Sequence, residues 1–168
     1  MLDVLNAVYD FIYAYSKNEN VPQFSENQII RGWQNSAVLP QESQDFCVFS
    51  EINTIRHGTN EESLIIEHLI QIDFYSLNPF IARSRANLIE LLDFTRVATD
   101  FFKKINKSLT CLYAEDVRNL TGLDETKSFL ARYQVVIHLE ERLNQAIQTD
   151  YFTNVNLHLE NVDVHHKI

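Results

Sequence analysis

Two runs of alternating apolar and polar residues, separated by a short polar loop, lie near the middle of the chain. In the first run Phe46, Val48 and Ile52 occupy even positions. In the second run the even positions hold Leu64, Ile66, Ile70, Ile72 and Phe74. A period of two is typical of a half-buried antiparallel strand. The loop between the runs, residues 56–62, is polar and contains a turn glycine, so the pattern predicts a β-hairpin.

Helical periodicity precedes this hairpin. Residues 2–17 carry apolar side chains at three- and four-residue intervals, which predicts an amphipathic N-terminal helix. Ser25 and Gln28 then have the spacing of a capping box. We therefore expect a short second helix at about residues 26–34.

One long helix is expected after the hairpin. Asn78 is a favourable N-cap, Pro79 suits the first helical position, and the pattern continues to Ile105. At about 1.5 Å per residue this helix would be about 40 Å long and could cover a whole sheet. Its expected apolar side includes Leu88, Leu91, Leu92, Val97, Ala98, Phe101 and Phe102, and its expected polar side includes Arg83, Arg85 and Glu90.

The C-terminal part contains two further strand patterns. Residues 129–139 alternate most cleanly, and residues 152–159 alternate again. The segment 141–151 between them is a strand extension or a protruding hairpin, and residues 108–124 read as irregular. The order α-α-β-β-α-β-β predicts an α+β fold, with a mainly antiparallel four-stranded sheet packed by a long helix and an N-terminal helix. We expect a single domain over residues 1–168, with a loose tail from about residue 161.

Composition and charge narrow the function. Fourteen basic and 23 acidic residues give a net charge of −9, which argues against tight binding to a phosphate backbone. No apolar run approaches the roughly 18–20 residues of a membrane span. The first residues lack the basic segment of a signal peptide. Cys47 and Cys111 have no metal or redox spacing and are expected to be buried free thiols, as in a reducing cytoplasm.

The sequence contains no recognisable catalytic, cofactor-binding or metal-binding motif. His68 lies on the apolar side of its strand and is expected to be a hydrogen-bonded core or interface histidine. His138 and His158 could face each other on neighbouring strands, but a third ligand is missing. We therefore expect no enzyme and no cofactor. A small metal-dependent enzyme that uses His138, His158 and Glu140 is the alternative.

Two arginines interrupt or end apolar strands. Arg56 and Arg132 would face solvent if they only continue the alternation. Each could instead form an ion pair across a subunit boundary, where the rigid donor fork of arginine is favoured. Asp73, Glu67 or a residue in the 115–125 loop of a neighbour could be the partner.

The apolar surface predicted for the sheet is larger than one layer of helices can cover. The chain has 11 Phe, 7 Tyr and 1 Trp. The second face of the sheet is expected to carry Phe49, Ile65, Leu69 and Tyr75. Surplus apolar surface marks association sites, so the pattern favours an oligomer. A monomeric adaptor that binds a partner through this face is a further alternative.

Several segments, in this order and spacing, resemble bacteriophage neck and tail-terminator proteins. They are IIRGWQNSAVLP (residues 29–40), FCVFSEINTIRHGTN (46–60), QIDFYS (71–76), ARSRANLIELL (82–92), LYAEDVRNLTGLDETKSFLARYQVVIHLE (112–140) and NVD (161–163). The resemblance extends from about residue 2 to residue 163. It implies an α+β fold with helices against a mainly antiparallel sheet, in agreement with the periodicity.

The resemblance implies a structural virion protein that is assembled in the host cytoplasm. Such proteins typically form a hexameric ring on the end of the tail tube, which stops tube polymerisation and presents a surface for head attachment. The implied partners are further copies of the chain, the tail tube protein and a head-completion or connector protein. DNA would pass through the ring without specific binding, and no membrane is involved. Another head-tail connector role is the alternative within this machinery.

The expected ring contacts come from the sheet edges and the second sheet face. The 56–62 loop and residues 141–150 would project toward a neighbouring subunit, the tube or the head. The candidate subunit-interface residues are Arg56, His57, Asn60, Glu62, Tyr75, Arg132 and Tyr133.

Overall fold

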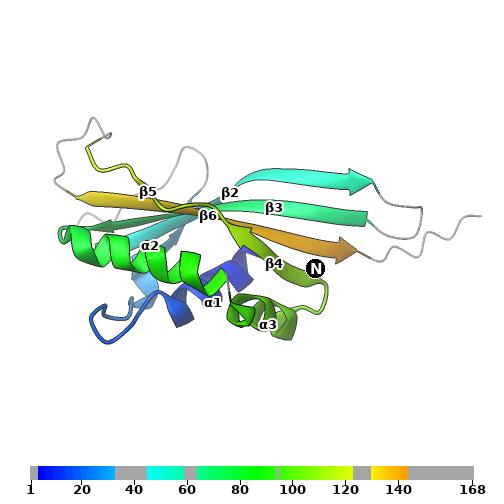
Figure 1. The fold of residues 1–168 in the computed structure, drawn as a ribbon, viewed down its shortest axis with the longest axis horizontal. Helices are drawn as coiled ribbons and strands as arrows, with labels where there is room; N and C mark the ends of the chain where they lie inside the picture. Colours follow the sequence, from blue (N-terminus) through cyan, green and yellow to red (C-terminus); the bar gives the residue numbers. More distant parts are fainter. Residues whose placement is uncertain (1–3, 33–44, 59–63, 94, 123–129, 144–168) are drawn as a thin grey trace, which may run out of the picture.

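The computed structural model describes residues 4–32, 45–58, 64–93, 95–122 and 130–143. Within these segments, three helices lie against one side of a six-stranded sheet (Figure 1). The elements are α1 (Val4–Tyr15), the 3-10 turn η1 (Glu26–Gln28), β1 (Ile29–Arg31), β2 (Asp45–Gly58), β3 (Leu64–Ser76), α2 (Pro79–Asp93), α3 (Arg96–Ile105), β4 (Leu109–Ala114), β5 (Arg118–Asn119) and β6 (Ala131–Leu143). The predicted α+β class and the N-terminal helix are confirmed.

The sheet has the strand order β1-β2-β3-β6-β4, and β5 pairs separately with β6. The β1–β2 pair is parallel and the other pairs are antiparallel. The prediction of a four-stranded sheet was therefore wrong, since three short strands were not recognised. The strand predicted at residues 152–159 and the tail from residue 161 lie outside the described residues. For residues 141–151, the expected strand extension is confirmed for residues 141–143, because β6 continues to Leu143.

The predicted second helix is a single 3-10 turn followed by β1. The capping box is present, with the Ser25 backbone N–H donating to Gln28 Oε1 at 2.7 Å. Gln28 Nε2 also donates to the Asp45 carbonyl at 2.8 Å, which brings the turn against the start of β2. From there, Ile29–Arg31 pair with residues 47–49. Because nucleating a short helix is unfavourable, pairing with the open edge of β2 wins here.

The segment predicted to be irregular, residues 108–124, contains β4 and β5. The register between β4 and β6 shifts between Cys111 and Tyr113. Such a bulge moves every following residue to the opposite face, so β4 shows no simple alternation. Leu109, Cys111 and Ala114 are buried, and Leu112 and Tyr113 are exposed.

The predicted long helix is divided into α2 and α3. Thr95 caps α3, where its side chain accepts a hydrogen bond from the Val97 N–H at 3.3 Å. The buried stripe of α2 consists of Ala82, Arg85, Ala86 and Ile89. Of the expected apolar side of α2, Leu92 packs against the core, whereas Leu91 was placed wrongly and is 60% exposed. Small alanine side chains let α2 pack close to the sheet, and the break before α3 resets the helical phase so that Ala98 and Phe102 are buried.

The main core lies between the helices and one face of the sheet. The even positions of β3 mark this face, as predicted, and Ile70, Ile72 and Phe74 are fully buried. On β2 the even positions do not mark it. Cys47 and Phe49 pair with Phe74 and Ile72, so these odd positions face the helices. The expected place of Phe49 on the second face was therefore wrong. Both cysteines are free and buried, as predicted.

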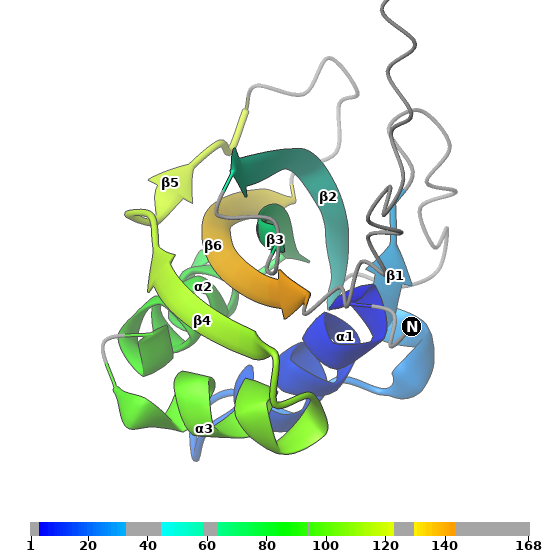
Figure 2. The ribbon, with the colours of Figure 1, turned by 90° about the vertical axis from the view of Figure 1, so that its right-hand side faces the viewer.

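The strands β2, β3 and β6 continue beyond the helices on the right of Figure 1, and the sheet twists strongly along its length (Figure 2). We define the distal end as residues 52–58, 64–69 and 138–143 of these three strands. A register shift between Glu51 and Asn53 separates it from the rest of β2. The segment predicted as a loop from Arg56 therefore begins as strand, because β2 runs to Gly58.

Candidate functional site

Polar contacts join three strands at the distal end. Glu67 on β3 lies between two histidines of the neighbouring strands. Its Oε1 is 2.7 Å from His138 Nδ1 on β6, and its Oε2 is 2.9 Å from His57 Nε2 on β2. An ionised carboxylate can only accept, so each ring donates through an N–H. These two hydrogen bonds, first that from His138 and then that from His57, lower the pKa of Glu67 below its ordinary value.

The fourth strand, β4, packs on the same histidine. The Tyr113 ring stacks on His138, with 4.0 Å between the ring centroids and 19° between the planes. Glu115 Oε1 is 3.4 Å from His138 Nε2. Burial, and after it the negative charges of Glu67 and Glu115, raise the pKa of Tyr113. His138 is thereby held from three directions and is buried.

The opposite arrangement occurs on the other face of the sheet. His68 is buried between two carboxylates, with Nδ1 2.6 Å from Glu51 Oε1 and Nε2 3.4 Å from Glu141 Oε2. The expectation that His68 is buried is therefore confirmed, and its Nδ1 is hydrogen-bonded to Glu51, whereas Nε2 has no hydrogen-bond partner within the described segments. At and beside the distal end, a glutamate thus lies between two histidines on one face of the sheet, and a histidine lies between two glutamates on the other. The suggested His138–His158 contact involves a residue outside the described segments.

Two of the candidate interface residues, Arg132 and Tyr75, lie together on the sheet face that is not covered by the helices. Arg132 Nε donates to Asp73 Oδ1 at 3.0 Å, and its guanidinium carbon is 5.6 Å from the centre of the Tyr75 ring. Tyr75 also stacks on Phe46 at 4.6 Å. Asp73 was one of the expected partners of Arg132, but the ion pair forms within the chain. It therefore requires no subunit boundary.

The other candidate residues lie elsewhere. Arg56 and His57 are exposed at the distal end and alternate on β2, so they point to opposite faces. His57 contacts Glu67, whereas Arg56 forms no ion pair with any described residue. Asn60 and Glu62 lie outside the described residues. The structure therefore brings only Arg132 and Tyr75 into one group.

Tyr133 lies on the helix side of the sheet, at the end away from the distal end. Together with side chains of α2 and of the segment between β4 and β5, it lines a surface pocket of about 440 Å³. The other lining residues are Arg83, Asn87, Glu90, Asp116, Val117 and Asn119. Glu90 Oε1 accepts a long hydrogen bond of 3.4 Å from the Val117 N–H, which connects the two walls of the pocket.

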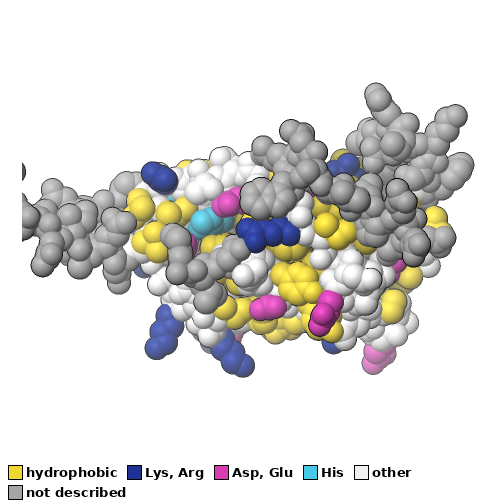
Figure 3. All heavy atoms as spheres, turned by 180° about the vertical axis from the view of Figure 1, so that it is seen from behind, with side chains coloured by type: hydrophobic (Ala, Val, Ile, Leu, Met, Phe, Trp, Pro, Cys, Tyr) yellow, Lys and Arg dark blue, Asp and Glu magenta, His cyan; other side chains and the backbone are white. Residues whose placement is uncertain are grey.

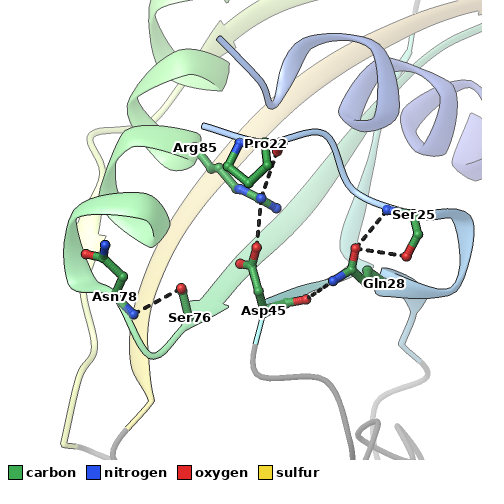
Figure 4. Close-up of polar contacts among 7 residues, drawn as sticks. All are labelled: Pro22, Ser25, Gln28, Asp45, Ser76, Asn78 and Arg85. Carbon is green, nitrogen blue, oxygen red and sulfur yellow. Dashed lines mark hydrogen bonds and ion pairs between the residues drawn. The ribbon is translucent and has the colours of Figure 1, made fainter. Parts of the chain in front are cut away.

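Arg85 is a structural residue that the sequence reasoning placed wrongly on the polar side of its helix. It is 1% exposed, and Nη2 donates to the Pro22 carbonyl at 2.9 Å and to Asp45 Oδ2 at 2.8 Å (Figure 4). Its guanidinium carbon is 3.4 Å from the centre of the Phe24 ring. Burial lowers the pKa of Arg85, and burial raises the pKa of Asp45 although Arg85 opposes that shift.

Arg85 therefore connects α2 to the segment after α1 and to the first residue of β2. The signal for its burial was its position in the stripe of Ala82, Ala86 and Ile89, at helical spacing. We missed this signal because charged residues are almost never fully buried unless they are paired.

The side chains of these groups make hydrogen bonds, ion pairs and ring contacts. Among the described residues, no group of three or more His, Cys, Asp or Glu side chains is arranged to hold a metal ion. None of the helices in the described segments is both long enough and apolar enough to cross a membrane. The polar groups of the distal end form hydrogen bonds and ion pairs with one another, and the pocket near Tyr133 contains both acidic and basic side chains.

Comparison with known proteins identifies the family. The sequence pattern of the family described as "Phage neck terminator protein" matches residues 6–165, which include almost all the described elements from α1 to β6. No curated protein matches the chain significantly. The expected resemblance is confirmed over nearly the whole chain. The chain therefore belongs to the phage neck terminator family, whose members are structural proteins of the bacteriophage neck.

Proposed function

We propose that copies of this chain form a ring in the neck of the virion, at the end of the completed tail tube. The ring stops polymerisation of the tube, presents the surface to which the head attaches and surrounds a channel for DNA. The family match over residues 6–165 is the observation that carries this proposal.

The sheet offers two outer strands for contacts between subunits. Among the described strands, β1 pairs only with β2 and β4 pairs only with β6, so each has one outer edge. Unpaired backbone groups at a strand edge are a template for association with another chain. Because the two edges differ, a contact between them would be heterologous, which is the type of contact that generates rings.

Apolar side chains on the outside of the protein also favour association. Leu77 and Phe80 are exposed at the start of α2, and Leu112 is exposed on β4. In the view from behind, hydrophobic side chains lie among charged ones over much of the visible surface (Figure 3). At the left of this view, a histidine lies beside an acidic side chain and close to hydrophobic ones. Exposed apolar surface with polar neighbours is typical of interaction sites.

The charge of the chain suits a channel through which DNA passes. With a net charge of −9 per subunit, a ring of several copies would repel the phosphate backbone on average. Tight binding would require clustered lysine and arginine side chains that neutralise phosphates. We therefore expect DNA to be guided through the channel and not to be held there.

The first test is the solution mass of the purified protein over a wide concentration range, measured by light scattering after size exclusion, with negative-stain images of large species. The expected result is a ring of about six subunits with a central hole. If the free protein is monomeric, purified tail tubes are added and their ends are imaged. Tubes that remain uncapped and continue to grow would contradict the proposal.

The same images distinguish this function from that of another head-tail connector. A terminator is expected at the end of the tail tube before heads are added. Binding to the portal of isolated heads, without binding to tubes, would instead assign the chain to head completion.

A further inference from the structure

We infer that the ring contact is head-to-tail, and that Arg56 of one copy enters the pocket lined by Glu90, Asp116 and Tyr133 on the next copy. This inference rests on the proposed ring and assigns residues to its contact. The occupant of the pocket is thus a second copy of this chain.

The pocket has the charge and the lining to receive a guanidinium group. Glu90 and Asp116 contribute two negative charges and Arg83 contributes one positive charge, so the lining has a net charge of −1. Asp116 is exposed, and the half-buried Tyr133 provides an aromatic surface. Arginine forms fork-like hydrogen bonds with carboxylates and also stacks on aromatic rings. The volume of about 440 Å³ leaves room for a side chain of this size.

Among the residues that the structure describes, Arg56 has no ion-pair partner, in contrast to several other arginines of the sheet. Three of them are paired within the chain: Arg142 with Glu140 at 2.7 Å, Arg118 with Glu115 at 2.7 Å, and Arg132 with Asp73 at 3.0 Å. Arg56 is exposed and forms no ion pair within the described segments. A cation of this kind is available for a neighbouring subunit at little cost to its own fold.

The register of the sheet places Arg56 and the pocket at opposite ends of the same face. Arg56 pairs with Ile66, which pairs with Glu141, and Phe74 pairs with Tyr133. Residues 66 and 74 of β3 are even-numbered, like the buried Ile70 and Ile72, so the side chains paired with them also face the helix side. Along β6, Glu141 beside Arg56 and Tyr133 of the pocket are eight residues apart, or about 26 Å at the rise of an antiparallel strand.

A donor and an acceptor at the two ends of one face make a heterologous contact. Each copy uses its distal end toward one neighbour and its pocket toward the other. Such contacts close into a ring when the rotation between neighbours allows it. The helix layers of all copies would then lie on the same side of the ring.

The test uses charge reversal at both ends. Arg56→Glu places a carboxylate opposite a pocket of net charge −1, and Asp116→Arg changes the pocket to +1 opposite the native Arg56. Each variant alone is expected to raise the concentration for half-assembly at least about tenfold, since like charges in an interface cost several kcal/mol. A mixture of the two variants restores both contacts and should assemble, as should the double variant. The mass is measured by light scattering, or on tail tubes if wild-type rings need tubes.

Matched controls separate this contact from a general effect of charge. Arg142→Glu makes the same change at the distal end on the other sheet face, and Asp100→Arg changes an exposed position on α3. Both controls should assemble like wild type, and circular dichroism should show that all variants are folded.

Three outcomes would overturn the inference. Normal assembly of Arg56→Glu would show that Arg56 is not in the contact, but it would not contradict the proposed ring. Single variants that fail but do not rescue each other would show that Arg56 and the pocket are not partners. A wild-type protein that forms no ring, free or on tubes, would remove the proposed ring itself and with it this contact.

Discussion

Glu67 and His138 lie diagonally across β3 and β6, with 2.7 Å between Glu67 Oε1 and His138 Nδ1. The second oxygen of Glu67 contacts His57 on β2, at 2.9 Å. One carboxylate thus connects the three strands that extend beyond the helices. Because the helix layer does not cover this end of the sheet, these polar contacts contribute to its stability in place of core packing (Figure 1).

The replacement Glu67→Gln should destabilise the protein in a pH-dependent way. The pKa of Glu67 in the folded protein lies below its ordinary value of 4.5, so the ionised carboxylate stabilises the fold at pH values above 4.5. This contribution is lost as the pH falls below 4.5 and passes through the lowered pKa. We expect a decrease of about 2 kcal/mol in the free energy of unfolding at pH 6, typical of hydrogen bonds to a charged group. At pH 3 the difference should be much smaller. Urea unfolding at both pH values measures it.

Glu140→Gln is the matched control for this measurement. Glu140 pairs with Glu67 in the register of β3 and β6, but its side chain contacts the exposed Arg142. Removing its charge should change the free energy of unfolding by less than about 1 kcal/mol, as for other surface ion pairs. An equal loss for both variants, or a loss in Glu67→Gln that is the same at pH 3 and pH 6, would refute the role of Glu67.

Arg85→Ala should be among the most destabilising single changes in α2. It leaves Asp45 without its cation and the Pro22 carbonyl without the guanidinium donor, and it removes the contact with Phe24. Breaking a buried ion pair from one side costs about 3 kcal/mol or more. Arg83→Ala, two residues earlier on the exposed side of the same helix, should cost less than about 0.5 kcal/mol. Thermal unfolding compares the two variants, and similar melting temperatures would contradict the structural role of the buried Arg85.

Cys47 and Cys111 should react with a thiol reagent only after the protein opens. Both are buried, and burial raises the pKa of the Cys47 thiol well above its ordinary value. Because the thiolate is the reactive form, labelling of the native protein should be slow. In denaturant, two thiols per chain should react rapidly. Fast labelling of the native protein would show that the core between the helices and the sheet is open to solvent.

The coupling between Arg132 and Asp73 can be measured by a double-mutant cycle. The variants Arg132→Ala, Asp73→Asn and their combination should give a coupling energy of about 1 kcal/mol or more, because Asp73 is buried and its Oδ1 accepts from Arg132. Assembly of each variant is measured in parallel. A coupling energy near zero, together with a strong loss of assembly in Arg132→Ala, would indicate that Arg132 acts at the subunit interface and not through Asp73.

The sequence by itself determined the class of the fold and much of its core. The period of two in β3 and in β6, and the helical period of α1, identified these elements because each has one face buried against the core over several successive turns or pleats. The burial of both cysteines and of His68 followed from the same pattern. The order of the segments also gave the family, which the match over residues 6–165 confirms.

Only the tertiary structure decided the elements whose pattern is interrupted. The register shifts in β2 and β4 change which residues face the core, and the break before Thr95 changes the phase of the helix. β1 and β5 are too short to show a period at all, and they exist because an edge of β2 or β6 is available beside them.

The polar groups of the candidate site also depended on the tertiary structure. Glu67 meets His138 and Arg85 meets Asp45 across 71 and 40 residues of sequence, and no local pattern gives such a pairing. Arg132 and Tyr133 are adjacent in the sequence, yet the strand places them on opposite faces, one against Asp73 and the other in the pocket. Sequence periodicity records which side of an element is buried, because burial acts on every turn or pleat of that element. The contacts between distant side chains are fixed only when the strands and helices are packed together.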